Sequence, residues 1–168
     1  VAPPALLALV HAAEAGLWPK SHHLRRLKSG AAPLAPELAH RFMALTGVPI
    51  TQGYGMTEAS PVTHIGYYDA ARCKPESIGH PVAQTECQVI NVNGEPAADA
   101  EPGELLMRGP QIMLGYWKSP DATAAAIRDG WYYSGDIVTR DAGGYYYVLD
   151  RSKEMIKYKG FSIAPAEI

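Results

Sequence analysis

The chain has 168 residues, close to the common size of one domain, and its 47% apolar and 19% charged residues are typical of a globular protein with a hydrophobic core. Its formal net charge is −2 and it has no run of Lys or Arg, so the composition gives no reason to expect a nucleic-acid partner. The longest apolar stretch near the start, residues 5–10, is far too short for a membrane span.

Helices and short strands are predicted to alternate from residue 1 to about residue 66. Residues 3–15 and 36–46 each begin with Pro and are followed by Gly, which predicts two helices. Residues 24–29 and 48–52 are predicted strands, and this alternation is typical of an α/β layer with a parallel sheet. Three residues at helical spacing are expected to form the buried face of the second helix: Leu38, Phe42 and Leu45.

Residues 78–149 are predicted to form a mostly antiparallel, barrel-like β unit. Asn93-Gly94 is a strong hairpin signal, and a Ser119 cap followed by Pro120 predicts one helix that continues to Arg128. The expected strands are residues 86–92, 103–109, 131–133, 137–139 and 145–149.

Several residues in this chain allow a second interpretation. The tyrosines at 145–147 could stack on nucleic-acid bases, but we favour aromatic residues on both faces of a strand. The histidines show no metal-ligand spacing. Cys73 and Cys87 are too far apart for a Cys-x-x-Cys motif, so we expect free thiols in a reducing compartment.

The segment after residue 149 is too short to be an independent domain. Residues 153–159 and 161–164 are predicted to pair as strands around a turn at Gly160, and Pro165 is expected to open a helix. We therefore expect residues 150–168 to be the first hairpin of a further domain.

Residues 52–58 carry the clearest chemical signal in the chain. They follow a predicted strand of the α/β section, and such sheets bind ligands at the carboxyl ends of their strands. Gly53 and Gly55 allow a close backbone approach to a ligand, and Tyr54 offers a flat face for a base. Thr57 supplies a hydroxyl donor suited to a phosphate oxygen, and Glu58 supplies a carboxylate suited to Mg²⁺.

Five motifs along the chain resemble those of the adenylate-forming superfamily, which includes acyl-CoA ligases, luciferases and peptide-synthetase adenylation domains. They follow one another in the order that the family has, and together they cover nearly the whole chain. The motifs are GAAPL at 30–34, YGMTE at 54–58, GEL at 103–105 with GYW at 115–117 and Thr123, WYYSGD at 131–136, and DRSKEMIKYKGF at 150–161. Ser134 stands where the family usually has Thr, which keeps the hydroxyl.

The resemblance is closest to 4-coumarate-CoA and fatty acyl-CoA ligases, because the run at 157–161 and the Ala-Pro-Ala-Glu at 164–167 differ from those of most adenylation domains. It implies that residues 1–149 are the C-terminal part of a large AMP-binding domain, with an α/β section at 1–77 and a β-rich subdomain at 78–149. Residues 150–168 would be the hinge and the start of a small domain. Such enzymes join a carboxylic acid to the α-phosphate of ATP and then pass the acyl group to coenzyme A.

The resemblance also assigns roles to single residues. The turn of Gly30, Ala31, Ala32 and Pro33 would flank the adenine of ATP or AMP, on which Tyr54 would stack, with Gln52, Gly53 and Gly55 beside it. Thr57 would donate a hydrogen bond to the α-phosphate, and Glu58 would hold Mg²⁺.

Further roles follow from the later motifs. Asp136 would accept both ribose hydroxyls, because two carboxylate oxygens match two donors, and Arg151 would lie near the same ribose. Lys153 would be the hinge pivot between the domains, and Lys157 would have a catalytic role. Four small or apolar residues would form walls of the acyl pocket: Ala59, Ser60, Pro61 and Val62.

The sequence leaves its biological setting and some rival functions open. It does not begin with Met, and it has neither the family's phosphate loop nor its closing lysine, so we expect a piece of a longer enzyme that is inactive alone. The expected location is cytoplasmic, or peroxisomal in a eukaryote. An adenylation domain, a luciferase-like enzyme and a non-catalytic β-rich interaction module are the alternatives.

Overall fold

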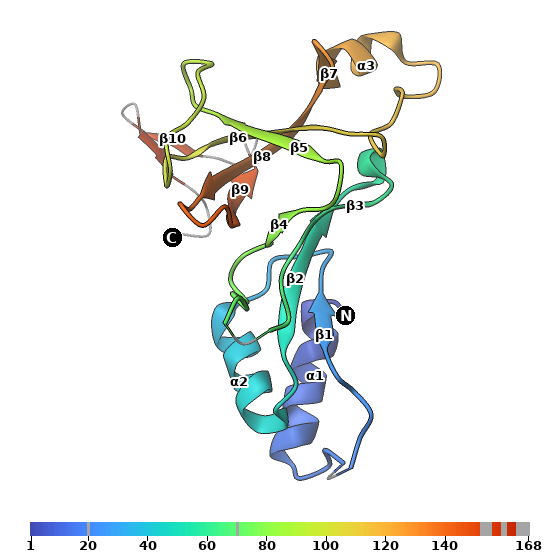
Figure 1. Ribbon diagram of the computed structural model, residues 1–168, viewed down its shortest axis with the longest axis vertical. Helices are drawn as coiled ribbons and strands as arrows, with labels where there is room; N and C mark the ends of the chain where they lie inside the picture. The colour runs from blue at the N-terminus through green and yellow to red at the C-terminus, as the bar shows by residue number, and fades with distance from the viewer. Residues whose placement is uncertain (20, 70, 152–155, 159–160, 164–168) are drawn as a thin grey trace.

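The computed structural model describes residues 1–151, 156–158 and 161–163 apart from residues 20 and 70; for 151, 156–158 and 161–163 it describes the backbone alone. The molecule is elongated, with two helices and a small sheet at one end and a curled sheet at the other (Figure 1). No helix among the described residues is long and apolar enough to cross a membrane.

The first part contains two helices and a four-stranded sheet in the order β1-β2-β3-β4. Only β1 and β2 run parallel; the other two pairings are antiparallel, so the expected parallel sheet is correct for one pair alone. The connection between β2 and β3 is too short for a parallel crossover, which leaves the antiparallel arrangement. The elements are α1 (Pro3–Glu14), β1 (Leu27–Ser29), α2 (Pro36–Thr46), β2 (Ile50–Gly55), the 3₁₀ turn η1 (Thr57–Ala59), β3 (Val62–Ile65) and β4 (His80–Pro81).

The core of this part lies between the two helices and β2. Leu6 and Val10 of α1 pack with Phe42 of α2 and Ile50 of β2, and all four are fully buried. The predicted helices are confirmed, and Gly47 ends α2 in the left-handed conformation. The prediction for Leu45 was wrong. Leu45 is 42% exposed, because the buried face of α2 is formed by Ala39 and Phe42.

The strand boundaries in this part also differ from the prediction. β1 begins at Leu27 rather than residue 24, and β2 continues through Gly53-Tyr54-Gly55, beyond the predicted end at residue 52. Gly55 makes this possible, because a Cβ there would lie 1.8 Å from the carbonyl oxygen of Pro61. The same close approach lets the amide of Met56 donate to that oxygen at 2.7 Å.

The second part is a five-stranded antiparallel sheet that curls into a half-barrel. Its order is β5-β6-β8-β7, and β9 also pairs with β8. The expected antiparallel β unit is confirmed, although residues 131–140 form one long strand instead of two. The elements are β5 (Glu86–Ile90), β6 (Gly103–Arg108), α3 (Pro120–Ala126), β7 (Ile127–Arg128), β8 (Trp131–Arg140) and β9 (Tyr146–Arg151).

The predicted helix in this part ends two residues early. Ile127 and Arg128 leave α3 because they pair with Tyr132 and Trp131 as β7. Ser119 stands at the N-cap position but makes no capping hydrogen bond through its side chain, contrary to the prediction. Asn93-Gly94 does form a turn, but the returning chain makes only a single bridge, between Ile90 and Pro96.

The inner face of the curled sheet forms the second core, and seven buried residues make it up: Ile78, Val89, Leu105, Met107, Tyr132, Val138 and Tyr146. Tyr145 is also buried, and its hydroxyl donates to the carbonyl of Arg72 at 2.9 Å. The hydroxyl of Tyr147 donates to Asp141 at 3.0 Å. The aromatic run is therefore part of the packing of a strand, as we favoured.

The segment before β4 joins the two parts. Ser77 donates to the carbonyl of Tyr146 at 2.7 Å, and the Lys74 ammonium donates to Asp141 at 2.6 Å. His64 of β3 lies between the rings of Tyr54 and Tyr146 at the same joint. Burial lowers the pKa of His64 to about 3, so this histidine is neutral and acts as a core residue.

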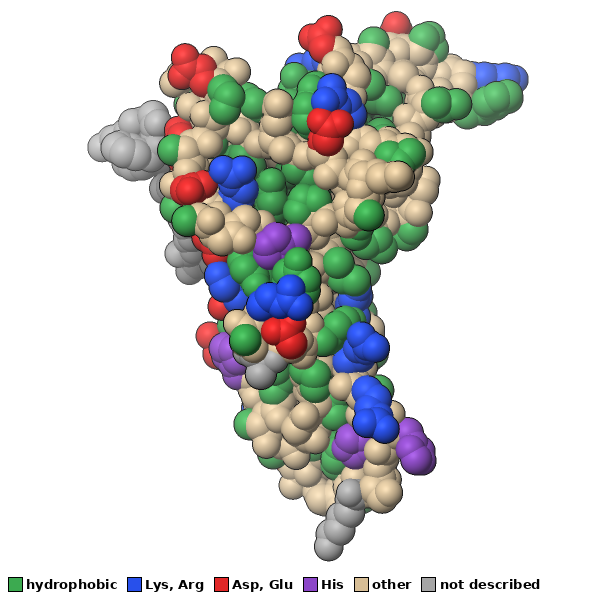
Figure 2. Space-filling view, viewed as in Figure 1, with side chains coloured by type: hydrophobic (Ala, Val, Ile, Leu, Met, Phe, Trp, Pro, Cys, Tyr) green, Lys and Arg blue, Asp and Glu red, His purple; other side chains and the backbone are tan. Residues whose placement is uncertain are grey.

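Charged side chains on the surface occur largely as neighbours of opposite sign. Cationic and acidic groups lie side by side in several places on the face shown in Figure 2. Exposed ion pairs such as Arg108–Glu86 and Arg140–Asp99 add little to the stability of the fold, because water and salt screen them.

The last described segment is a separate two-stranded hairpin. β10 (Ile156–Tyr158) pairs antiparallel with β11 (Phe161–Ile163), which confirms the predicted strand pair. Lys153 and the helix expected at Pro165 lie outside the described residues. The division of the chain into an AMP-binding part and the start of a small domain stays a prediction.

Candidate active site

Two residues from different parts of the chain meet at the centre of the candidate site. Tyr54 is on β2 and Asp136 is on β8, 82 positions later in the sequence. The hydroxyl of Tyr54 donates to a carboxylate oxygen of Asp136 at 2.5 Å. Burial, and then the neighbouring Asp136 charge, raise the pKa of Tyr54 well above its ordinary value, so its hydroxyl remains a donor at neutral pH.

The turn at residues 134–136 fixes the position of Asp136 within β8. Gly135 has a φ of 72°, a conformation that glycine adopts without strain, and its amide donates to Glu104 at 3.0 Å. The hydroxyl of Ser134 accepts the amide hydrogen of Asp136 at 3.1 Å. A hydroxyl is what this turn requires, which explains why Ser can stand where Thr is usual.

The turn at residues 30–33 packs directly beside β2. A Cβ on Gly30 would lie 3.2 Å from the carbonyl oxygen of Gly53, so this glycine allows the close approach. Ala31 has a φ of 72° and is exposed, as are Ala32 and Pro33. The structure thus brings the predicted adenine turn next to Tyr54, with its outer residues open to a ligand.

Gln52 holds this turn in place. Its buried side-chain amide donates to the carbonyl of Pro75 at 2.9 Å and accepts from the amide of Leu34 at 3.3 Å. Both ends of the amide are therefore used by the protein. Gln52 lies at the predicted site, but these contacts make it a residue that positions the turn.

Glu58 is attached to a loop from the second part of the chain. Its carboxylate accepts a hydrogen bond from the hydroxyl of Tyr116 at 2.9 Å, and its carbonyl accepts from the amide of Met113 at 2.8 Å. Burial, and then the contact with Glu58, raise the pKa of Tyr116. Thr57, the neighbouring residue in η1, is exposed.

The surroundings of Glu58 are compatible with Mg²⁺. Among the described residues no group of three or more His, Cys, Asp or Glu side chains could form a complete protein cage. Mg²⁺ in nucleotide sites is usually held by one or two carboxylates together with substrate phosphates. A single half-buried carboxylate beside an exposed threonine hydroxyl fits that donor set.

The residues predicted to line the acyl pocket do not share one surface. Ala59 is fully buried, whereas Ser60, Pro61 and Val62 are exposed, and Val62 has 40% of its surface open. Ser60 has a φ of 53° and precedes a cis peptide bond to Pro61. Their role in binding an acid stays a prediction.

The residues predicted after β8 are described in part. The register of β8 and β9 places Arg151 directly opposite Asp136, which agrees with a position near the same ribose. Lys157 lies on β10, opposite Ser162. Lys153 lies outside the described residues.

Comparisons with known proteins identify the family. The family model described as AMP-binding enzyme matches residues 1–117. The chain belongs to the AMP-binding enzyme family. This match includes the turn at residues 30–33, Tyr54 and Glu58.

Similar members of the AMP-binding family are CoA ligases. A long-chain-fatty-acid–CoA ligase of Bacillus subtilis is 39% identical over an alignment of 168 positions that covers 99% of this chain and 30% of that protein. A feruloyl-CoA synthase of Amycolatopsis is 43% identical over 145 residues, covering 86% of this chain and 29% of that protein. This chain therefore spans about a third or less of their length.

A solved structure agrees with the fold of this family member. The crystal structure of an anthranilate CoA ligase in complex with anthranoyl-AMP superposes with a TM-score of 0.85 at 27% identity. The match covers 99% of this chain and 32% of that chain. The α/β section and the half-barrel are therefore parts of an adenylate-forming fold.

Two residues at or beside the candidate site, Tyr116 and Thr123, were given no role by the sequence analysis. Both were part of a recognised motif. The sequence signal for them was their place in the motif that begins at Gly115, because a motif residue without a chemical role often positions another residue. The joint occupied by His64 gave no signal in the sequence.

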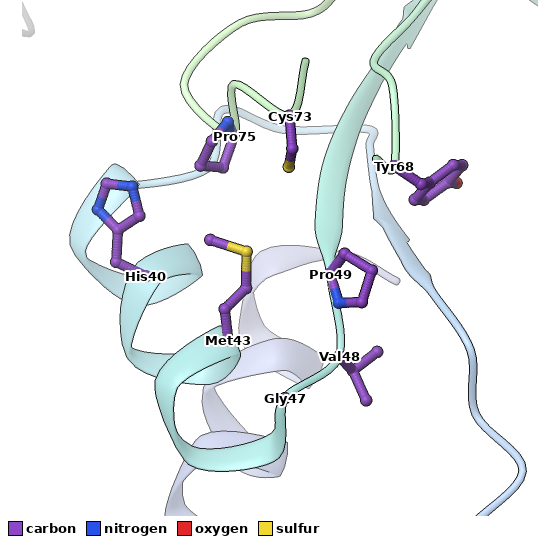
Figure 3. Close-up of a pocket in the computed structure, with 8 residues that line it drawn as sticks. All are labelled: His40, Met43, Gly47, Val48, Pro49, Tyr68, Cys73 and Pro75. Carbon is purple, nitrogen blue, oxygen red and sulfur yellow. The ribbon is translucent and has the colours of Figure 1, made fainter. Parts of the chain in front are cut away.

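The hollow drawn in Figure 3 is separate from the predicted site. It has a volume of about 400 Å³ and lies between α2, the start of β2 and the segment near Cys73. Cys73 and Cys87 are both free thiols. The lining residues are His40, Met43, Gly47, Val48, Pro49, Tyr68, Cys73 and Pro75, and the predicted site residues are not among them.

Proposed function

We propose that a protein containing this chain is an ATP-dependent carboxylate–CoA ligase. The observation that carries the proposal is the meeting of Tyr54 and Asp136 at 2.5 Å, in a chain whose similar relatives are named as CoA ligases. A buried carboxylate beside an aromatic ring and a glycine-rich turn is suited to a nucleoside. The whole site would accept ATP, a carboxylic acid and coenzyme A.

The chain's own residues would bind the nucleotide through distinct groups. The ring of Tyr54 and the turn at 30–33 would hold the adenine, and Asp136 would accept the two ribose hydroxyls. The backbone position of Arg151 opposite Asp136 supports a role at the same ribose. Because the Tyr54 hydroxyl uses the same carboxylate, it would have to share Asp136 with the ribose.

Thr57 and Glu58 would act at the phosphates. The Thr57 hydroxyl would donate to an oxygen of the α-phosphate, and the Glu58 carboxylate would hold Mg²⁺. When bound there, Mg²⁺ supplies positive charge that reduces the repulsion between the phosphates and the incoming carboxylate. Lys157 would be a further catalytic group, on β10.

The reaction would have two steps. In the first, an oxygen of the acid attacks the α-phosphorus of ATP, forming an acyl-adenylate and releasing pyrophosphate. In the second, the sulfur of coenzyme A attacks the acyl carbon, forming a thioester and releasing AMP. A rotation of the small domain about Lys153 would separate the two steps, since hinges absorb large torsions in few residues.

An aromatic or fatty acid is the proposed substrate class. The names of the relatives include a long-chain fatty acid and ferulate, which supports both classes. The small side chains of Ala59 and Ser60 would leave space for the tail of the acid. The cytoplasmic location stays a prediction.

Activity can be measured in a chimera in which this chain replaces the matching segment of the Bacillus subtilis ligase. We expect acid-dependent exchange of pyrophosphate into ATP with a fatty or an aromatic acid, and loss of most of it in Asp136→Ala, since removal of such positioning contacts costs about 10²-fold or more. A chimera that folds, as judged by circular dichroism, but exchanges pyrophosphate with neither class of acid would contradict the proposal.

A further inference from the structure

The loop between β6 and α3 is fastened to Glu58 at two points. The backbone amide of Met113 donates to the Glu58 carbonyl at 2.8 Å, and the Tyr116 hydroxyl donates to Glu58 Oε1 at 2.9 Å. The backbone bond fixes where residue 58 lies, and the side-chain bond fixes how its carboxylate is turned. These contacts join the loop between β6 and α3 to η1, although Met113 and Tyr116 lie 55 and 58 positions after Glu58 in the sequence.

α3 holds the tyrosine that makes the second contact. The amide of Tyr116 donates to the hydroxyl oxygen of Thr123 at 2.9 Å, and that hydroxyl donates to the carbonyl of Ser119 at 2.9 Å. Gly115 makes room for this arrangement, because a Cβ there would lie 2.7 Å from the Thr123 methyl group. Its φ of 154° is also one that residues with side chains rarely adopt.

From this geometry we infer that Tyr116, anchored by Thr123, is a positioning residue that orients the Glu58 carboxylate toward the metal. The inference rests on the proposed function, in which Glu58 holds Mg²⁺. One oxygen of Glu58 is engaged by the tyrosine, and no hydrogen bond from a described residue reaches the other, Oε2. Gly115, Tyr116 and Thr123 of one motif thereby act together on Glu58, which belongs to the YGMTE motif at 54–58.

A purely local role for Tyr116 explains less of the structure. Tyr116 as a whole is 38% exposed, so packing alone does not account for its position. The loop is held by backbone bonds at Met113 and Tyr116, so little further freedom is lost when the hydroxyl meets Glu58. Groups that orient a metal ligand in this way commonly change metal affinity by about 10- to 100-fold when removed.

Tyr116→Phe tests the inference directly. It removes the hydroxyl and keeps the ring, and we expect an effect near the lower end of that range, about tenfold, because the contact is partly exposed. Tyr147→Phe is the matched control, since it also removes a tyrosine hydroxyl that donates to a carboxylate, Asp141, away from the site. All variants are made in the chimera defined above, together with Glu58→Gln.

The primary measurement is the affinity for Mn²⁺, used as a probe of the Mg²⁺ site, by water proton relaxation in the presence of α,β-methylene-ATP. We expect the dissociation constant to rise about tenfold in Tyr116→Phe and to change less than about twofold in Tyr147→Phe. The Mg²⁺ concentration that gives half-maximal pyrophosphate exchange should rise in parallel, with the KM for the acid unchanged. Equal Mn²⁺ affinities in the two tyrosine variants would overturn the inference.

Two further variants separate the possible failures. If Glu58→Gln binds Mn²⁺ with normal affinity, Glu58 does not hold the metal, and the proposed metal role of Glu58 is rejected. If Glu58→Gln loses Mn²⁺ affinity but Tyr116→Phe does not, only the role of Tyr116 is rejected. Thr123→Val should weaken Mn²⁺ binding, and Thr123→Ser, which keeps the hydroxyl, should restore it. Normal binding in Thr123→Val would reject the anchor.

Discussion

At the scale of single residues, the contact between Tyr54 and Asp136 is proposed to couple stability to ligand binding. Asp136 is 8% exposed, and a buried carboxylate needs hydrogen-bond donors to offset its lost hydration. The Tyr54 hydroxyl is one such donor, at 2.5 Å. The same carboxylate is proposed to accept the ribose hydroxyls, so folding and binding would use one group.

Tyr54→Phe should therefore affect these two properties in different ways. Loss of a hydrogen bond to a buried charged group should lower the free energy of unfolding by about 1–3 kcal/mol. The ring proposed to stack on adenine remains, and the ribose would no longer compete with the hydroxyl, so AMP should bind at least as tightly. Urea unfolding and calorimetric titration of AMP check both; weaker AMP binding with unchanged stability would show that the hydroxyl serves the ligand.

At the scale of elements, the turn between β2 and β3 is built around a glycine. Tyr54 lies just before this turn and Glu58 lies within it, in η1, so its shape decides where both side chains point. Gly55 is required by close packing against Pro61, with φ outside the left-handed range, whereas Gly47 at the end of α2 is required by its φ of 70°. Replacement by alanine should therefore lower the free energy of unfolding by different amounts at the two glycines.

Gly55→Ala should be the more damaging of the two changes. Its Cβ would lie 1.8 Å from a backbone oxygen, and relief of such overpacking costs about 1–3 kcal/mol or more. The Cβ added by Gly47→Ala would meet no atom within 4 Å. This substitution should therefore lower the free energy of unfolding only by the strain of a positive φ, about 1–2 kcal/mol. Chemical denaturation compares them, and equal losses would contradict the packing argument. Gly55→Ala should also weaken AMP binding.

At the scale of the whole molecule, the segment at residues 72–80 connects the α/β section to the half-barrel. Asp141 in the turn between β8 and β9 receives hydrogen bonds from Lys74, Tyr147 and the amide of Tyr145. Burial raises the pKa of the Asp141 carboxyl, but these bonds outweigh it and lower the pKa from 3.8 to about 2. A carboxyl whose pKa is lower in the folded state stabilises the fold only when ionised.

Asp141→Asn should consequently reduce the stability of the chimera in a pH-dependent way. The contribution of Asp141 is complete above its unfolded pKa of about 3.8 and disappears as the pH falls through about 2. The stability difference between the wild-type chimera and the variant should therefore be constant near neutrality and shrink between pH 4 and pH 2. Thermal unfolding across this range is the measurement, and a difference that stays constant would argue against the ion pair.

Local sequence determined most of the elements and the identity of the family. Proline starts and glycine ends mark both helices of the first part, and alternating apolar residues mark β5, because these signals act over a few neighbouring positions. The motifs at 30–34, 54–58 and 131–136 named the residues of the candidate site in advance. The resemblance to the family implies their roles, and the chemistry of a carboxylate, a ring and a hydroxyl is consistent with each proposed role.

Tertiary structure alone decided which of these residues meet. The exposure of Leu45 depends on how α2 packs against α1 and β2, which lie elsewhere in the sequence. The same holds for the bonds of Tyr54 to Asp136 and of Tyr116 to Glu58, which span 82 and 58 positions. No local pattern encodes such a contact, because it forms only when both cores have packed and the two parts are joined.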